Sequence, residues 1–215
     1  MRAAAIRITA LLLLVGLGLA GCGGSDHTEQ AAAPGCERVG TPKPRNASLP
    51  APKQLVRPGE KLTAVVGTSC GSFDIALDTT RAPKTTNSFV YLSRKGLYDG
   101  LDFHRVIPGF VVQGGDPLGN GTGGPGYQVD ETPPPNLAYT KGVVAMAKSP
   151  VEPPGRSGSQ FFVVTVADAG LSPDYALLGR VAQGMNVVER IGSLGTPSGH
   201  PKQRVLIRRV TIERG

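Results

Sequence analysis

The sequence predicts a mainly β domain folded as a closed antiparallel barrel with two helices over its ends. Three observations predict this class. Short runs rich in β-branched and aromatic residues recur along the chain, as strands prefer. Two segments of the domain carry apolar residues at helical spacing. The 215 residues include 30 glycines and 19 prolines, which favours a loop-rich β protein over a helical bundle.

We expect three parts along the chain: a leader over residues 1–21, a spacer over 22–58 and the β domain over 59–215. The leader has the composition of a secretory signal, with a basic start at Arg2 and Arg7, an apolar core and small residues at its end. Its apolar core is too short for a transmembrane helix, which needs about twenty apolar residues. The leader therefore predicts export from the cytoplasm.

The leader ends on Leu19-Ala20-Gly21-Cys22, which resembles the bacterial lipobox. In that motif the cysteine is acylated and becomes the first residue of the mature protein. The resemblance implies a lipid anchor on Cys22 and an extracytoplasmic position at a bacterial cell membrane. An N-acylated diacyl-thioether cysteine exceeds the two-signal threshold for stable anchoring. The alternative is an ordinary cleaved signal with an unmodified Cys22, and mass spectrometry of the mature protein distinguishes the two.

The predicted spacer is rich in Gly, Ala, Pro, Lys and Ser, and its apolar residues have no period, so it cannot build a core. Its proline content predicts a semi-extended connection between membrane and domain. Cys36 lies in this spacer and Cys70 lies in the first hairpin of the domain. Outside the cytoplasm two remaining cysteines often pair, so we expect a Cys36–Cys70 disulfide. The alternative is a free buried Cys70 with a mobile Cys36.

The domain begins with a predicted hairpin, in which strands over 62–69 and 71–77 are separated by a Cys-Gly turn. A helix over 82–92 follows. Pro83 suits the first turn of this helix, and Gly96 suits its C-terminal end.

A second short helix is expected over 186–191, where Val187, Val188 and Ile191 lie at helical spacing. Apolar runs between and after the two helices predict further strands. In addition to two short strands within residues 103–116, these strand regions are 142–147, 159–165, 174–181 and 204–212. The last of them would pair back onto the sheet and close it.

The most informative stretch covers residues 103–116. Pro108-Gly109 interrupts its apolar run, so it predicts two short strands bent at a Pro-Gly kink. Alternation around such a bend brings four side chains to one surface. These side chains are Arg105, Phe110, Val111 and Gln113. The expected surface is an apolar floor beside a guanidinium and an amide.

From this stretch onward the chain is similar to the cyclophilins, which are peptidyl-prolyl cis-trans isomerases. The resemblance spans roughly residues 62–213 and rests on ordered blocks. The blocks are FHRVIPGFVVQGGDP and residues 121–124, 141–147, 158–162 and 178–181. It implies an eight-stranded barrel, proline-containing polypeptides as partners, and neither a metal nor an organic cofactor.

The resemblance also implies a role for each site residue. Arg105 would donate a hydrogen bond to the prolyl nitrogen or carbonyl, and Gln113 would hold the substrate backbone and orient Arg105. The proline pocket would be formed by Phe110, Val111, Phe162 and Leu171. The other substrate-binding positions would be Ala147, Lys148, Gln160 and Tyr175.

The chain departs from the family pattern at several of these positions. Val111 replaces a frequent Met, Lys148 replaces a frequent Asn, and Tyr175 stands where many members carry His. No Trp stands near Gly170, where cyclosporin-sensitive members carry one. These departures bear on drug affinity more than on catalysis. Ala147 and Lys148 would still offer their backbone groups to the peptide.

Other chemistries have weaker support. The net charge is +7, but the basic residues form no face with aromatic partners, so nucleic acid is not an expected partner. The Gly-rich loop over 117–126 lacks the Lys-Ser/Thr of a phosphate cradle.

His104 has no second His at metal-ligand spacing, so we expect a structural residue. Ser159 lacks a His/Asp context, which argues against a hydrolase. Without the motif, Phe110 and Phe162 would fit an ordinary core.

The residues and the resemblance together predict a monomeric, lipid-anchored prolyl isomerase that helps exported proteins fold. One alternative is a catalytically weak module that binds proline-containing segments on the cell surface. Another is a non-catalytic structural lipoprotein. The pairing of Arg105 with Gln113 favours the isomerase, because a pure binding module does not need that guanidinium.

Overall fold

The computed structural model describes residues 32–215. The predicted leader and the predicted lipidation site Cys22 lie outside the described residues. A compact unit covers Ala32 to Gly215. Within this described part of the chain, no helix has the length and apolar character needed to cross a membrane.

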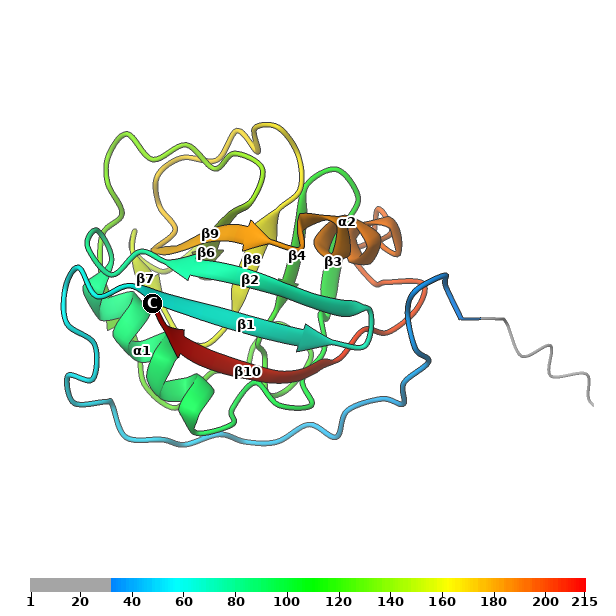
Figure 1. Cartoon of the computed structure of the whole chain (residues 1–215), viewed down its shortest axis with the longest axis horizontal. Coiled ribbons are helices and arrows are strands. Elements are labelled where there is room, and N and C mark those ends of the chain that lie inside the picture. The colour runs from blue at the N-terminus through cyan, green and yellow to red at the C-terminus, as the bar shows by residue number, and fades with distance from the viewer. Residues whose placement is uncertain (1–31) are drawn as a thin grey trace, which may run out of the picture. The chain divides into compact units, whose positions relative to one another are not determined.

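Eight strands form one antiparallel sheet in the order β10-β1-β2-β9-β6-β8-β4-β3 (Figure 1). They are β1 (Leu62–Thr68), β2 (Gly71–Leu77), β3 (Arg105–Ile107), β4 (Val111–Gly114), β6 (Val143–Met146), β8 (Phe161–Val164), β9 (Leu177–Gln183) and β10 (Ile207–Arg214). A separate two-stranded ladder joins β5 (Val129–Asp130) to β7 (Arg156–Ser157). The expected number of strands in the main sheet is therefore present.

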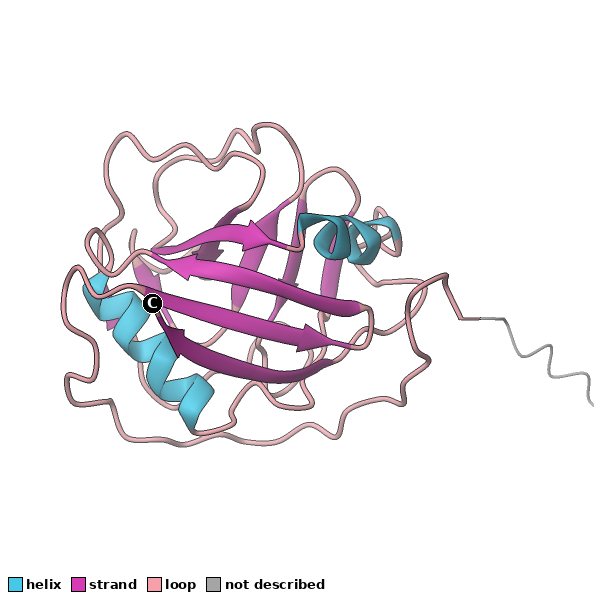
Figure 2. Ribbon diagram, viewed as in Figure 1, coloured by secondary structure: helices cyan, strands magenta, loops and turns pink. Residues whose placement is uncertain are grey.

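Two helices accompany the sheet, α1 (Pro83–Arg94) and α2 (Met185–Ser193). Figure 2 shows them in cyan at opposite ends of the sheet. Pro83 occupies the first turn of α1, and Gly96 follows its end with a φ of 65°, a conformation that favours glycine. The inward face of α2 carries Val188 and Ile191, both fully buried.

The expectation of a closed barrel is wrong, because β3 and β10 are the two free ends of the strand order. Strand β3 has three residues, and its outer edge bonds to the loop after α2 instead. The N–H of Val106 donates to Gly199 O at 2.7 Å, and the N–H of Thr196 donates to Val106 O at 3.3 Å. Asp102 and Leu206, which precede the end strands β3 and β10, pair only in an isolated bridge. The sheet is an open half-barrel.

Alternation along the strands divides the apolar residues into two clusters. In β8, Phe161 joins the main core, whereas Phe162 joins a smaller cluster on the opposite face. In β4, Val112 and Val111 divide in the same way. The smaller cluster continues into half-buried side chains at the surface. These are Phe110, Leu137, Ala147, Val166, Ala169, Leu171 and Tyr175.

Residues 32–58, which we call the strap, contain no helix or strand but lie against the domain. Figure 1 shows the strap in blue to cyan, passing along one side of the molecule and below α1. A disulfide joins Cys36 to Cys70. The N–H groups of Leu55 and Val56 both donate to Asn87 Oδ1 on α1, at 2.6 and 3.0 Å. The strap therefore belongs to the same compact unit as the rest of residues 32–215.

Candidate active site

A groove of about 1300 Å³ opens over the smaller apolar cluster. Its walls come from β3, β4, the Gly-rich loop over 117–126, and the loops around β8. All the residues predicted for catalysis or substrate binding line it. They are Arg105, Phe110, Val111, Gln113, Ala147, Lys148, Gln160, Phe162, Leu171 and Tyr175.

A chain of hydrogen bonds fixes the polar side chains along the groove. Arg105 faces Gln113 in the β3–β4 ladder, and its Nη1 donates to Gln113 Oε1 at 3.0 Å. The Gln113 amide donates to Gln160 Oε1 at 3.1 Å. The Gln160 amide donates in turn to Gly121 O at 3.0 Å and to Gly123 O at 2.9 Å. Each amide therefore has a defined orientation, and the last one joins the Gly-rich loop to the site.

The Arg105 guanidinium provides a positive charge beside the apolar floor. Its Cζ lies 6.0 Å from the centre of the Phe110 ring. Within residues 32–215 it makes no ion pair with a carboxylate. The hydrogen bond to Gln113 uses one of its five N–H donors, so further donors can serve a ligand.

The floor of the groove is an aromatic cluster centred on Phe162, which is 4% exposed. Its ring centre lies 5.4 Å from that of Tyr175 and 6.3 Å from that of Tyr139, and both distances are typical of attractive aromatic pairs. Val111, which is 2% exposed, belongs to the same cluster. These contacts hold a flat apolar surface open to the groove.

Tyr139 supports this floor from below and carries no sequence signal that predicts the role. Its hydroxyl donates to Tyr175 O at 2.6 Å and accepts from Tyr175 N–H at 3.0 Å. Burial raises the pKa of Tyr139 to about 12, although the hydrogen bond to Tyr175 opposes this shift. The phenol is therefore protonated at neutral pH and keeps donating to the Tyr175 backbone.

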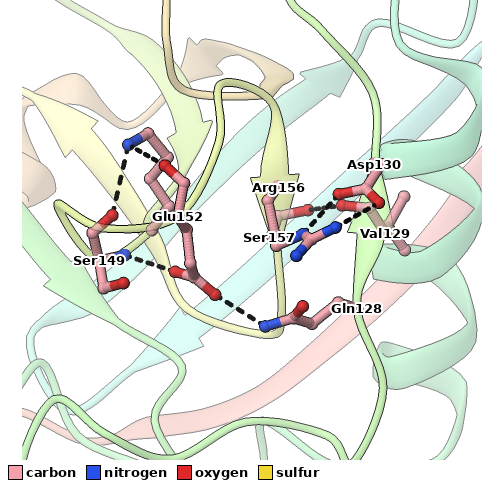
Figure 3. A network of polar contacts seen from close by, with 8 residues as sticks. Gln128, Val129, Asp130, Ser149, Glu152, Arg156 and Ser157 are labelled. Atoms are coloured by element: carbon pink, nitrogen blue, oxygen red, sulfur yellow. Dashed lines mark hydrogen bonds and ion pairs between the residues drawn. The ribbon is translucent and has the colours of Figure 1, made fainter.

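The loop after β6 is held by the polar network drawn in Figure 3. The Glu152 carboxylate accepts from Ser149 N–H at 2.6 Å and from the Gln128 amide at 2.7 Å. The Lys148 ammonium donates to Glu152 O at 3.0 Å and lies 5.6 Å from the centre of the Tyr175 ring. Glu152 thus fixes this loop and helps to place a second cation, Lys148, at the groove.

The β5–β7 ladder beside this loop is closed by an ion pair, also drawn in Figure 3. Arg156 donates from Nε to Asp130 Oδ1 at 2.7 Å and from Nη2 to Asp130 Oδ2 at 2.9 Å. These hydrogen bonds lower the pKa of Asp130. The pair is exposed, so its main effect is to fix the geometry of the two short strands.

Ala147 offers less backbone than expected. Its N–H already donates to Gln160 O at 2.8 Å, so this donor is not free for a substrate. The Ala147 carbonyl and the Lys148 backbone remain candidates for substrate contacts. The Ala147 N–H is occupied because Ala147 continues the pairing of β6 with β8 by one more hydrogen bond.

His104 also lines the groove, but its ring is mostly buried and neither ring nitrogen has a hydrogen-bond partner in the described chain. Burial lowers the pKa of His104, and the nearby Asp116 and Asp102 oppose the shift. The imidazole is therefore neutral near pH 7. Among residues 32–215, no group of three His, Cys, Asp or Glu side chains is arranged to hold a metal ion.

Comparison with known proteins gives consistent matches. Residues 63–212 match the family model for cyclophilin type peptidyl-prolyl cis-trans isomerase/CLD. Peptidyl-prolyl cis-trans isomerase B of Streptomyces anulatus is 39% identical over 174 residues, which cover 72% of this chain and 98% of the relative. The human peptidyl-prolyl cis-trans isomerase-like 1 is 41% identical over 135 residues, covering 61% of this chain and 80% of the relative.

The fold also matches a solved structure. A Cryptosporidium parvum cyclophilin type peptidyl-prolyl cis-trans isomerase, crystallised in the presence of the dipeptide Ala-Pro, superposes with a TM-score of 0.65. The sequence identity is 29%, and the match covers 71% of this chain and 99% of the solved chain.

Proposed function

The chain belongs to the cyclophilin-type peptidyl-prolyl cis-trans isomerases, and from this premise we propose that it isomerises X-Pro bonds in exported polypeptides and so helps them fold. The observation that carries the catalytic part is the Arg105 guanidinium, held by Gln113 beside the floor formed around Phe162. The export part rests on the sequence of the leader.

The reaction has a simple physical requirement. The X-Pro amide resists rotation because of its partial double-bond character, with a barrier of ~18–20 kcal/mol. Uncatalysed exchange takes tens to hundreds of seconds. No covalent bond is made or broken, so a catalyst has to bind the twisted amide more tightly than either planar form.

The groove residues can meet this requirement together. The pyrrolidine ring packs on Phe162 and Val111, with Phe110 and Leu171 at its sides, while the rest of the peptide turns. Twisting removes conjugation and leaves a lone pair on the prolyl nitrogen, which accepts a hydrogen bond from Arg105. A fixed donor aimed at charge that develops only in the transition state lowers the barrier. Gln113 acts as a positioning residue for that donor.

The test of this role is the substitution Arg105→Ala. We expect kcat/KM to fall by about 10²-fold or more, because loss of one fixed donor costs this much in comparable sites. The measurement is a protease-coupled assay on a proline tetrapeptide, with circular dichroism to verify the fold. Arg105→Lys is the matched control, since it keeps the charge but loses the planar fork. Equal rates for wild type and Arg105→Ala would instead favour a proline-binding module.

The extracytoplasmic position is proposed on the leader and on Leu19-Ala20-Gly21-Cys22. Acylated Cys22 would hold the protein, as a monomer, at the cell membrane. Mass spectrometry of the mature protein should find Cys22 acylated at the N-terminus, and Cys22→Ala should move the protein from the membrane fraction to the soluble fraction. An unmodified Cys22 in the mature protein would contradict the anchor and leave the isomerase activity unaffected.

A further inference from the structure

The groove has a wall that lies outside the family match. Arg45, Asn46 and Ala47, from the middle of the strap, line it together with residues of the Gly-rich loop. The family model matches residues 63–212 only. The strap therefore adds surface to the groove that the matched region does not supply.

Backbone hydrogen bonds seat this part of the strap on the Gly-rich loop. The N–H of Arg45 donates to Pro117 O at 3.0 Å, and the N–H of Leu49 donates to Pro125 O at 2.8 Å. The two contacts fall at the two ends of the loop. Between them the strap approaches Gly126 so closely that a Cβ there would lie 2.9 Å from the Cα of Ser48. Strap and loop thus pack backbone against backbone.

Further contacts make this wall rigid. The Arg45 guanidinium donates to the backbone oxygens of Leu97 and Asp99, the latter at 3.0 Å. Upstream the strap is tied by the Cys36–Cys70 disulfide. Downstream it is tied by the hydrogen bonds of Leu55 and Val56 to Asn87 described above. A wall that is already ordered loses little conformational entropy when a ligand binds.

Asn46 gives this wall the chemistry to bind a main chain. Its side chain is exposed, and among residues 32–215 its amide has no hydrogen-bond partner. An amide group supplies both donors and an acceptor, which match the N–H and C=O groups of an extended peptide. The neighbouring Ala47 is small and half-buried, so it leaves room beside the amide.

The order of contacts along the groove places Asn46 beyond the reacting bond. Arg105 leads to Gln113, Gln113 to Gln160, and Gln160 to the carbonyls of Gly121 and Gly123 in the Gly-rich loop. The strap lies on that same loop. A chain whose proline sits on the aromatic floor would therefore pass Gln160 before it reaches the strap.

We propose that residues 45–47 form a remote subsite for extended proline-containing polypeptides, in which the Asn46 amide hydrogen-bonds the substrate main chain several residues from the proline. This subsite rests on the proposed function and concerns its substrate class: unfolded segments rather than short peptides. Binding energy gained far from the reacting bond raises kcat/KM for the longer substrate.

The experiment compares a proline tetrapeptide with two longer peptides that extend the same centre by about six residues on one side or the other, roughly 20 Å of extended chain. Exchange is measured by NMR, which needs no protease. For Asn46→Ala we expect kcat/KM to fall by about 3- to 10-fold on one of the extended peptides, the effect of one hydrogen bond, and to stay unchanged on the tetrapeptide.

Two further variants make the comparison decisive. Ser48→Ala is the matched control, because Ser48 is an exposed polar strap residue that does not line the groove; it should match wild type on every peptide. Asn46→Gln keeps the amide and should recover part of the loss. The subsite would be overturned if Asn46→Ala and wild type had equal kcat/KM on both extended peptides. It would also be overturned if Asn46→Ala lost as much kcat/KM on the tetrapeptide as on the extended peptides. Failure of wild type to turn over any of the peptides would instead overturn the proposed function.

Discussion

The side chain of Gln113 lies between two other long polar side chains and bonds to both. It accepts from Arg105 and donates to Gln160, so it decides where the guanidinium points. Neither bond involves a charged acceptor, and the positive charge at Arg105 is therefore not neutralised by its support. This combination suits a group that must act on a neutral amide.

Replacing Gln113 by Leu tests this positioning role. The substitution introduces an apolar side chain of similar size and removes both hydrogen bonds. We expect kcat/KM to fall by about 10-fold, mainly in kcat, because the unsupported guanidinium spends less time aligned with the prolyl nitrogen. Steady-state kinetics on a proline tetrapeptide separates kcat from KM. A change confined to KM would show that Gln113 binds substrate without orienting Arg105.

His104 predicts a specific dependence of stability on pH. Burial lowers its pKa in the folded protein, so the unfolded chain binds this proton more readily than the folded one does. Stability is therefore fully present above the unfolded pKa of about 6.5 and falls as pH drops below it, towards the lower folded pKa.

The measurement is the free energy of unfolding from urea titrations at several pH values between about 7.5 and 5.5, for wild type and His104→Gln. As pH falls, the free energy of unfolding of wild type should decrease relative to that of His104→Gln, because the variant has no imidazole to protonate at this position. A difference that stays constant over this range would mean that His104 titrates normally in the folded protein.

At the scale of elements, the strap is a segment without secondary structure that is nevertheless bound along its length. Its ties are single groups: a disulfide at Cys36, the amide oxygen of Asn87, and carbonyls at Pro117 and Pro125. A Pro-rich composition predicts a semi-extended segment, and the strap contains no helix or strand. Composition carries no information on the distant acceptors, so of these ties the sequence predicts only the Cys36–Cys70 disulfide.

Reduction of the disulfide measures how firmly the strap is held. Cys36 and Cys70 are separated by 34 residues, and the chain-entropy model assigns a loop of this length about 3–4 kcal/mol of stability. We expect the free energy of unfolding to fall by up to this amount when the reductant is present. The double variant Cys36→Ser/Cys70→Ser should be equally weakened with and without reductant. If the free energy of unfolding of wild type did not change with reductant, and the untreated protein had two free thiols, a disulfide in solution would be contradicted.

Local sequence patterns predict most of the helices and strands, but they do not predict contacts between segments that are far apart in the sequence. Helices and strands follow from side-chain periodicity, and Arg105 and Gln113 share a surface because β3 and β4 are joined at Pro108-Gly109. Closure of the sheet depends instead on two edges that are far apart in the sequence. Strand β3 is too short and too well bonded elsewhere to meet β10. The role of Tyr139 could not be predicted either, because it depends on hydrogen bonds with the backbone of Tyr175, which is remote in the sequence.

At the scale of the whole molecule, the half-barrel separates stability from function by placing them on two faces of one sheet. The main core contains Phe161, whose ring centre lies 5.7 Å from those of both Phe89 and Tyr98. The groove floor contains the next residue, Phe162, in contact with Tyr139 and Tyr175. Adjacent residues of one strand therefore serve different purposes.

The substitutions Phe161→Leu and Phe162→Leu form a matched pair that tests this division. Both remove the same atoms from buried positions one residue apart. Phe161→Leu should lower the free energy of unfolding by about 1–2 kcal/mol and leave kcat/KM per folded molecule close to wild type. Phe162→Leu should lower kcat/KM by roughly 10-fold, because the flat surface for the pyrrolidine ring is lost, while its effect on stability should be the smaller of the two. Urea titration and NMR exchange on one peptide measure both quantities. If the two variants lost activity in proportion to their lost stability, the sheet would not divide the two tasks, and the groove floor would have to be treated as part of a single core.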